Sequence, residues 1–450
     1  MRGSSVVKND LMPLLKLAVP MAITGLVQSS LYFFENIFLS RLGEDVLAAG
    51  ALVSWLFGAL IVILFGIFGA VSILISHKYG AKDKEGITSV LRDSFLLAIL
   101  LVIPTFLLFR NISSIFLLFG QSKELVALAK LYLNALSWGL LPKFILIVLF
   151  EFLIGLGHSR TMMVVTLLTT PVYILFSFIL IFGKFGFPAL GIAGAGWGMT
   201  FADWMLSFIL GIFLMYSREY KPYFSSIFVF KKPDYLLEIM HLGLPMGAMY
   251  SIEVAFFLAA TLVMGTIGVQ ALAANQVTMQ YLGPLMSIIF SIAQAVTVRM
   301  GHQLGAREFD LVKRTAITGV CVSACFMGFM AVIYWTIPQV LISVDFDLQN
   351  PSYAKTIQLA VGFFFIAAFF QIFECIRITL FGALRALKDT HFTLLTSILS
   401  FWGIALPLGY YLATYFRLGG NGIWYGMVVG AVLSVLLLKW RFKQRMHRFY

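Results

Sequence analysis

The chain has 450 residues, of which 60% are hydrophobic and only 12% are charged, and its mean hydropathy is +0.95. Soluble globular domains are about 45–50% apolar and about 25% charged, so this composition excludes a soluble globular protein. The formal net charge of +12 calls for no nucleic acid partner, because the basic residues gather on one side of the predicted membrane spans.

The apolar residues form long continuous stretches, which predict an all-α membrane protein. A spanning helix needs roughly 20 mostly apolar residues, whereas the strands of a membrane barrel alternate in polarity over about 10. We place twelve spans, near residues 12–40, 45–75, 90–109, 128–154, 161–183, 191–216, 237–263, 269–298, 311–337, 357–382, 393–415 and 421–439.

The distribution of basic residues predicts the orientation of the spans. Twelve spans put both termini on the same side, and the segments on that side carry 23 Lys and Arg, against eight on the other side and one, Arg377, within a span. Cytoplasmic segments are the basic ones in membrane proteins. We therefore expect both termini in the cytoplasm and the basic end of the chain near lipid headgroups.

The sequence repeats at half of its length. The segment "RLGEDVLAAGAL" matches "TIGVQALAANQV", and "SHKYGAKDKE" matches "GHQLGAREFD", each pair with an offset of 225 residues. Such self-similarity indicates a duplicated structural unit. We predict one six-helix bundle at 1–216, a cytoplasmic linker at 217–234, a second six-helix bundle at 235–440 and a basic tail at 441–450.

An even number of spans in each half gives both halves the same orientation, so they form parallel repeats around a central cleft. Secondary transporters commonly have this organisation, with the substrate site between the halves. A duplication that serves structure alone is the other interpretation. We find no paired metal motif, nucleophile elbow or phosphate loop that would indicate an enzyme.

Several carboxylates stand inside the predicted spans, and the candidates among them are Glu253, Glu374, Glu35, Glu151 and Asp203. A charge in the membrane is costly, so each is a candidate functional residue that carries a proton, ligates a metal ion such as Na⁺ or pairs with a cationic substrate. The other interpretation is a structural ion pair. It applies least to Glu253, whose span has no basic partner, and more to Glu374, because Arg377 lies three residues further along the same helix face. It applies most to Glu35, Glu151 and Asp203, which lie nearer water or helix ends.

Polar and aromatic residues accompany these acids. In the repeat, Glu253 aligns with Gln28. Span 8 offers side chains that either bond a carboxyl group or ion, or join helices: Asn275, Gln276, Thr278, Gln280 and Tyr281. Aromatic rings suit lipophilic cations through burial and cation–π attraction, although such rings also face lipid or core. The candidates for lining a substrate cavity are Tyr32, Phe33, Phe34, Phe256, Phe257, Phe370 and Phe373.

The chain resembles the multidrug and toxic compound extrusion (MATE) family over nearly all of its length. The motifs are "FFENIFLSRLGEDVLAA", "GLP…IEVAFF", "ALAANQV", "VRMGHQLGA" and "FECIRITLFGALRALKDT". The resemblance is to the bacterial subgroup whose cation site lies in the C-terminal half. It implies that Glu253 and Glu374 bind the coupling cation and that Glu35 falls on the acid of span 1.

Four positions, in three places of the sequence, depart from that family pattern. Tyr173 and Ser177 replace the Asn and Asp that the other bacterial subgroup has in span 5, which argues against a cation site in the N-terminal half. Phe370 stands where a tyrosine is often found. Arg377 would repel a Na⁺ ion bound at Glu374, which favours coupling to H⁺.

The resemblance implies an antiporter of the bacterial inner membrane that exports lipophilic, often cationic drugs and toxic compounds in exchange for H⁺ or Na⁺ by alternating access. No other cofactor is implied, and we expect a monomer. A lipid-linked oligosaccharide flippase is the alternative. It would need a strongly basic cavity, whereas Arg377 is the one basic residue assigned to a span, with Lys143 and Lys16 as the further candidates.

Overall fold

The computed structural model describes residues 2–118, 120–224, 227 and 232–447. Among them, eleven helices are long and apolar enough to cross a membrane, or twelve if one bent pair forms a single span. The bent pair is α5 (Lys123–Ser137) and α6 (Leu140–Gly155), which meet at 53° where we predicted one straight span. The predicted all-α fold of twelve spans is confirmed.

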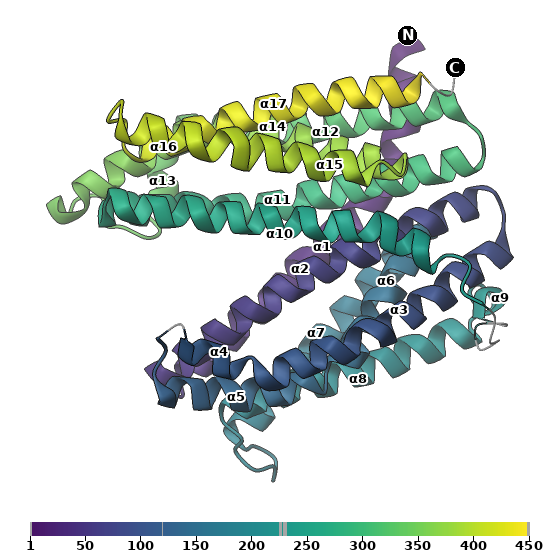
Figure 1. The fold of residues 1–450 in the computed structure, drawn as a ribbon, viewed down its shortest axis with the longest axis horizontal. Helices are drawn as coiled ribbons and strands as arrows, with labels where there is room; N and C mark the ends of the chain where they lie inside the picture. Colours follow the sequence, from purple (N-terminus) through teal and green to yellow (C-terminus); the bar gives the residue numbers. More distant parts are fainter. Residues whose placement is uncertain (1, 119, 225–226, 228–231, 448–450) are drawn as a thin grey trace. The chain divides into compact units, whose positions relative to one another are not determined.

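The chain forms two compact units, which Figure 1 shows as two groups of helices. The N-terminal unit comprises Ile23–Leu244, and the C-terminal unit comprises Met1–Ala22 and Pro245–Tyr450. The first helix, α1 (Arg2–Ser40), contributes to both units. The N-terminal unit continues with α2 (Glu44–Gly80), α3 (Lys84–Asn111), α4 (Ser113–Leu118), α5, α6, α7 (Ser159–Phe182), α8 (Ile192–Tyr216) and α9 (Lys221–Phe224).

The C-terminal unit holds the remaining helices and one π-helical segment, η2. They are α10 (Leu236–Ile267), α11 (Val269–Gly305), α12 (Phe309–Thr336), α13 (Pro338–Ile342), the 3₁₀ turn η1 (Pro351–Tyr353), α14 (Ala354–Ala386), α15 (Thr390–Ser397), η2 (Ile398–Ala405), α16 (Leu406–Thr414) and α17 (Gly420–Met446).

The start of α1, up to Ala22, belongs to the C-terminal unit, and the start of α10, up to Leu244, belongs to the N-terminal unit. Leu14 and Ala18 of α1 are buried in the C-terminal unit with Ile289 of α11. The start of α10 packs in the N-terminal unit, where a Cβ atom added to Gly243 would lie 2.9 Å from the carbonyl carbon of Ile67. Only glycine permits so close an approach of two backbones. The contact boundary therefore falls inside α1 and α10, rather than at the linker.

The linker predicted at 217–234 includes residues outside the described part of the chain. Its described end is fastened by Asp93 of α3, whose Oδ2 accepts hydrogen bonds from the backbone N–H groups of Asp234 and Tyr235, each over 2.7 Å. This carboxylate satisfies donors at the start of α10 that have no partner within the helix.

The segment predicted as a basic tail continues α17 as far as Met446, and residues 448–450 lie outside the described part. Arg441 and Arg445 each donate to Asp389 Oδ2, over 2.7 and 2.6 Å. Two of the basic residues that we expected at lipid headgroups are therefore paired with an acid of the turn between α14 and α15.

Helix α14 lies at the centre of the C-terminal unit, between α11, α12 and α17. The hydroxyl of Thr297 on α11 donates to the carbonyl of Gly382 over 2.8 Å, and the hydroxyls of Ser323 on α12 and Thr379 on α14 lie 2.8 Å apart. On the side of α17, the ring of Phe370 lies 6.0 Å from that of Trp424. These contacts hold the helix that carries Glu374 and Arg377.

Candidate functional site

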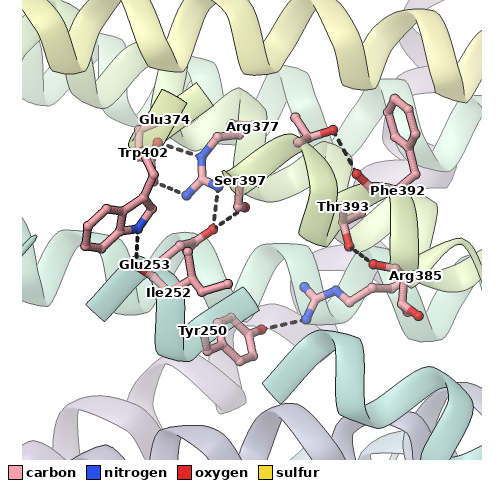
Figure 2. A network of polar contacts seen from close by, with 12 residues as sticks. Tyr250, Ile252, Glu253, Glu374, Arg377, Arg385, Phe392, Thr393, Ser397 and Trp402 are labelled. Atoms are coloured by element: carbon pink, nitrogen blue, oxygen red, sulfur yellow. Dashed lines mark hydrogen bonds and ion pairs between the residues drawn. The ribbon is translucent and has the colours of Figure 1, made fainter. Parts of the chain in front are cut away.

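A buried ion cluster joins α10 to α14 (Figure 2). The guanidinium of Arg377 donates from Nη1 to Glu253 Oε1 over 2.6 Å and from Nε to Glu374 Oε2 over 2.7 Å, and its Nη2 donates to Glu374 Oε1. The side chains of Arg377, Glu374 and Glu253 are 1%, 4% and 9% exposed. One cation thus bridges two acids that lie more than a hundred residues apart in the sequence.

Two aromatic rings enclose the guanidinium of this cluster. Its carbon lies 4.6 Å from the ring centroid of Phe381, one turn further along α14, and 4.7 Å from that of Phe401 in η2. A cation at this distance from a ring is attracted by the electrons of its face. The rings also keep water away, which strengthens the ion pairs.

The segment around Ser397 completes the surroundings of Glu253. The Ser397 hydroxyl donates to Glu253 Oε1 over 2.8 Å, and the indole Nε1 of Trp402 donates to the carbonyl of Ile252 over 3.0 Å. Sequence reasoning missed both residues, because they lie about 145 residues further along the chain, and a hydroxyl or an indole has no signature in the sequence. π-Helical turns such as η2 are rare and often occur at functional sites.

The expected pair of Glu374 and Arg377 is present, because residues three apart on a helix share a face. The expectation that Glu253 has no basic partner is wrong. It considered only the span of Glu253, whereas the partner is Arg377 on another helix. With both carboxylates ionised, the cluster carries one net negative charge.

Three of the five candidate polar residues of α11 bond to groups other than Glu253. Gln280 donates to Asp345 over 2.7 Å, Tyr281 donates to the carbonyl of Leu341 over 2.8 Å, and Thr278 bonds to the carbonyl of Ala274 in its own helix. Asn275 is buried, and Gln276 is exposed. Gln28 is half-buried and belongs to the N-terminal unit.

The remaining acids lie in the N-terminal unit, so Glu35 does not join the cluster. Glu35 is 3% exposed; the hydroxyl of Tyr173 donates to its Oε2 over 3.3 Å, and its Oε1 has no hydrogen-bond partner among the described residues. Asp203 pairs with Lys143 over 2.8 Å. Glu151 is buried in α6.

The aromatic candidates divide between exposed and buried positions. Phe33 and Phe34 are exposed, and Phe257 and Phe373 are half-buried. Phe256 and Phe370 are each 1% exposed in the core of the C-terminal unit, where the ring of Phe256 lies 4.7 Å from that of Phe401. The side chain of Tyr32 lies outside the described residues.

The cluster does not fit a metal ion while Arg377 is in place. In the described part of the chain, no three His, Cys, Asp or Glu side chains gather to hold a metal ion. Three of the four carboxylate oxygens of Glu253 and Glu374 already accept a guanidinium N–H. The positive charge that a Na⁺ ion would supply is therefore supplied by a side chain.

A helical membrane protein of two repeated bundles, with acids buried inside its spans, has the organisation of a secondary transporter. The chain belongs to the MatE family, whose sequence model matches residues 20–179 and 245–411. It is 32% identical to the "Probable multidrug resistance protein NorM" of Mesorhizobium japonicum, over 97% of this chain and 95% of the relative. It is 30% identical to the "Multidrug resistance protein NorM" of Burkholderia vietnamiensis, over 95% and 92%.

Solved structures share the fold. One, described as the "Outward-facing conformation of a multidrug resistance MATE family transporter of the MOP superfamily", matches with a TM-score of 0.87 and 19% identity, over 100% of this chain and 99% of that one. Another, the "Crystal structure of MATE in the bent conformation", matches with a TM-score of 0.88 over 100% and 98%, also at 19% identity.

Proposed function

We propose that this protein is an antiporter that exports lipophilic cationic compounds, including drugs, across a bacterial inner membrane in exchange for an inward-moving cation. The names of its relatives, which are multidrug resistance proteins, support the substrate class. The parallel repeats support alternating access, in which the two units expose one site to each side of the membrane in turn. We further propose that the protein acts as a monomer with both termini in the cytoplasm.

The proposal that export is coupled to a cation rests on one observation, which is the unequal number of acidic and basic side chains in the cluster of Glu253, Glu374 and Arg377. Glu253 and Glu374 share one guanidinium, so with both carboxylates ionised one negative charge is left without a partner in a buried site. A charge held away from water favours the uptake of a cation that neutralises it. We propose that this uptake stabilises the conformation that releases drug, because a ligand shifts an equilibrium only through different affinities for the two states.

We propose H⁺ as the coupling ion and keep Na⁺ as the alternative. A proton needs one carboxylate oxygen, whereas a metal ion takes several oxygen ligands, and Arg377 already engages three of the four carboxylate oxygens. We keep Glu35 as a second candidate for proton binding, because its carboxyl group is buried and half-satisfied.

Export from vesicles with separate gradients tests this proposal. Inverted membrane vesicles that contain the protein are loaded by a pH gradient alone or a Na⁺ gradient alone, and the uptake of ethidium, a lipophilic cation, is followed by fluorescence. We expect the pH gradient to drive uptake, Glu253→Gln to abolish it, and Glu308→Gln, at an exposed position before α12, to preserve it. Uptake at the full rate by Glu253→Gln would refute the coupling role.

The flippase alternative receives no support from the basic residues. Arg377 and Lys143 are each held by acids of the same unit, so they are not available to bind a pyrophosphate. Lys16 remains exposed near the start of α1.

A further inference from the structure

We infer that Arg377 is the resident cation of the acidic site in the C-terminal unit and determines its ion selectivity. While the guanidinium lies between Glu253 and Glu374, the site excludes Na⁺; without it, the same oxygens bind Na⁺. The inference deepens the proposed function by assigning the residue that selects the coupling ion. It concerns ion binding, which is measured on the purified protein without any transport.

The geometry of the cluster places the guanidinium where a bound metal ion would have to lie. Its N–H groups reach both oxygens of Glu374 and Oε1 of Glu253, so the two acids share one cation between α10 and α14. The Ser397 hydroxyl adds a donor to the same Glu253 oxygen. A Na⁺ ion between these carboxylates would have to displace a group that is already bonded to both.

Displacement of Arg377 is opposed by the contacts that it makes on its own helix. Its bonds to Glu374 and its contact with the ring of Phe381 lie within α14, so they persist however α10 moves. The ring of Phe401 in η2 also packs against the guanidinium, with its centroid 4.7 Å from the guanidinium carbon. An arginine stays protonated in proteins, so the site cannot lose this cation by deprotonation and gains no vacancy for another.

Removal of the guanidinium leaves two carboxylates and the Ser397 hydroxyl with no positive charge between them. Two close carboxylates left without a cation either hold a proton on one of them or bind another cation between them, and high pH favours the cation. Hard monovalent and divalent cations prefer oxygen ligands of this kind. Replacement of Arg377 by an uncharged side chain therefore converts an occupied site into one that takes up Na⁺.

Melting temperatures of purified protein test the assignment. They are measured at pH 8 in NaCl and in N-methyl-D-glucamine chloride of equal ionic strength, for wild type and four variants. Arg377→Gln removes the cation, Arg377→Lys retains a positive charge, and Glu253→Gln/Arg377→Gln also removes one acid. Arg385→Gln is the matched control, because Arg385 is equally buried on α14 but donates to the uncharged hydroxyl of Tyr250 over 2.7 Å.

We expect a saturable rise of the melting temperature with Na⁺ in Arg377→Gln alone. Wild type, Arg377→Lys and Arg385→Gln should respond equally little, and the double variant should lose the rise. A saturable rise in wild type that Arg377→Gln does not increase would overturn the inference, and so would an Arg377→Gln protein that is stable and indifferent to Na⁺.

A second measurement keeps the inference testable if Arg377→Gln does not fold. Binding of ²²Na⁺ to wild type is compared with binding to Glu253→Gln, which retains Arg377 and its pair with Glu374. We expect no saturable binding to either protein. Saturable binding to wild type that Glu253→Gln removes would show that Na⁺ enters the cluster beside the arginine, and would overturn the inference. If wild type exports ethidium with neither the pH gradient nor the Na⁺ gradient, that result would instead count against the proposed function.

Discussion

The hydroxyl of Ser397 lies 2.8 Å from Oε1 of Glu253, at the last α-helical residue before the backbone of η2 becomes π-helical. Trp402, within η2, donates to the carbonyl of Ile252 next to Glu253. One hydrogen bond to this turn of α10 thus comes from the residue just before η2 and the other from within η2. Glu253 and its neighbour Ile252 are therefore bonded directly to this irregular segment.

Replacement of Ser397 by alanine should destabilise the protein, because the buried oxygen of Glu253 loses a donor. Hydrogen bonds between membrane helices contribute about 0.6 kcal/mol on average and at most about 1.7 kcal/mol, and we expect the upper part of that range for an ionised acceptor. Ser434→Ala is the matched control, since Ser434 is also fully buried and its hydroxyl has no partner among the described residues. Equal melting temperatures of the two variants would contradict the prediction.

Neutralisation of Glu374 and of Glu35 should have opposite effects on stability at pH 8. Glu374→Gln removes a charged acceptor from the Arg377 guanidinium, which keeps its pair with Glu253, and the loss of a hydrogen bond to a charged group costs about 1.5–3 kcal/mol. Glu35 has a carboxylate oxygen without a partner among the described residues, so Glu35→Gln should be neutral or stabilise by about 1 kcal/mol. Thermal melting of both variants checks the signs, and a marked loss of stability in Glu35→Gln would show that its charge is compensated in the native protein.

The pair of Lys143 and Asp203 should behave as a unit within the N-terminal bundle. The Nζ–Oδ1 distance is 2.8 Å, and the side chains are 23% and 10% exposed. Lys143→Met or Asp203→Leu alone leaves a partly buried charge, at a cost of up to about 3–5 kcal/mol, whereas the double replacement by apolar residues is often close to neutral. A double-mutant cycle by thermal melting measures the coupling, and additive losses would argue against an ion pair.

The link between Asp389 and the end of α17 should depend on pH. Burial raises the pKa of Asp389, but the hydrogen bonds and charges of Arg445 and Arg441 outweigh it and hold the pKa below its usual value. A lowered pKa in the folded state contributes stability that is present above the unfolded value of about 3.9 and is lost as the pH falls through the folded value.

Asp389→Asn should therefore be less stable than wild type at pH 7, by about 1.5–3 kcal/mol for a lost charged acceptor. The difference should shrink as the pH falls below about 4. Melting temperatures across the pH range test this expectation, with Lys443→Gln as the control because Lys443 is exposed between the two arginines. A difference that stays constant down to pH 3 would rule out the ion pairs as its origin.

Local patterns in the sequence were sufficient to predict the membrane spans and one ion pair. Apolar stretches long enough for a bilayer predicted the helices, since each span is determined by its own residues. The pair of Glu374 and Arg377 followed from their spacing on one helix. The bend between α5 and α6 was missed, because the apolar pattern continues through residues 138 and 139.

Such local patterns could not predict contacts between segments that lie far apart in the sequence. The composition of a single span cannot show that Arg377 of α14 reaches Glu253 of α10, or that Ser397 joins them. The same holds for Glu35, which the sequence grouped with these acids and the structure places in the N-terminal unit with Tyr173. The sequence alone determined which helices form and which acids they carry, because both depend on neighbouring residues. The tertiary structure decided which charges meet, because ion pairs between helices depend on packing that no single segment encodes.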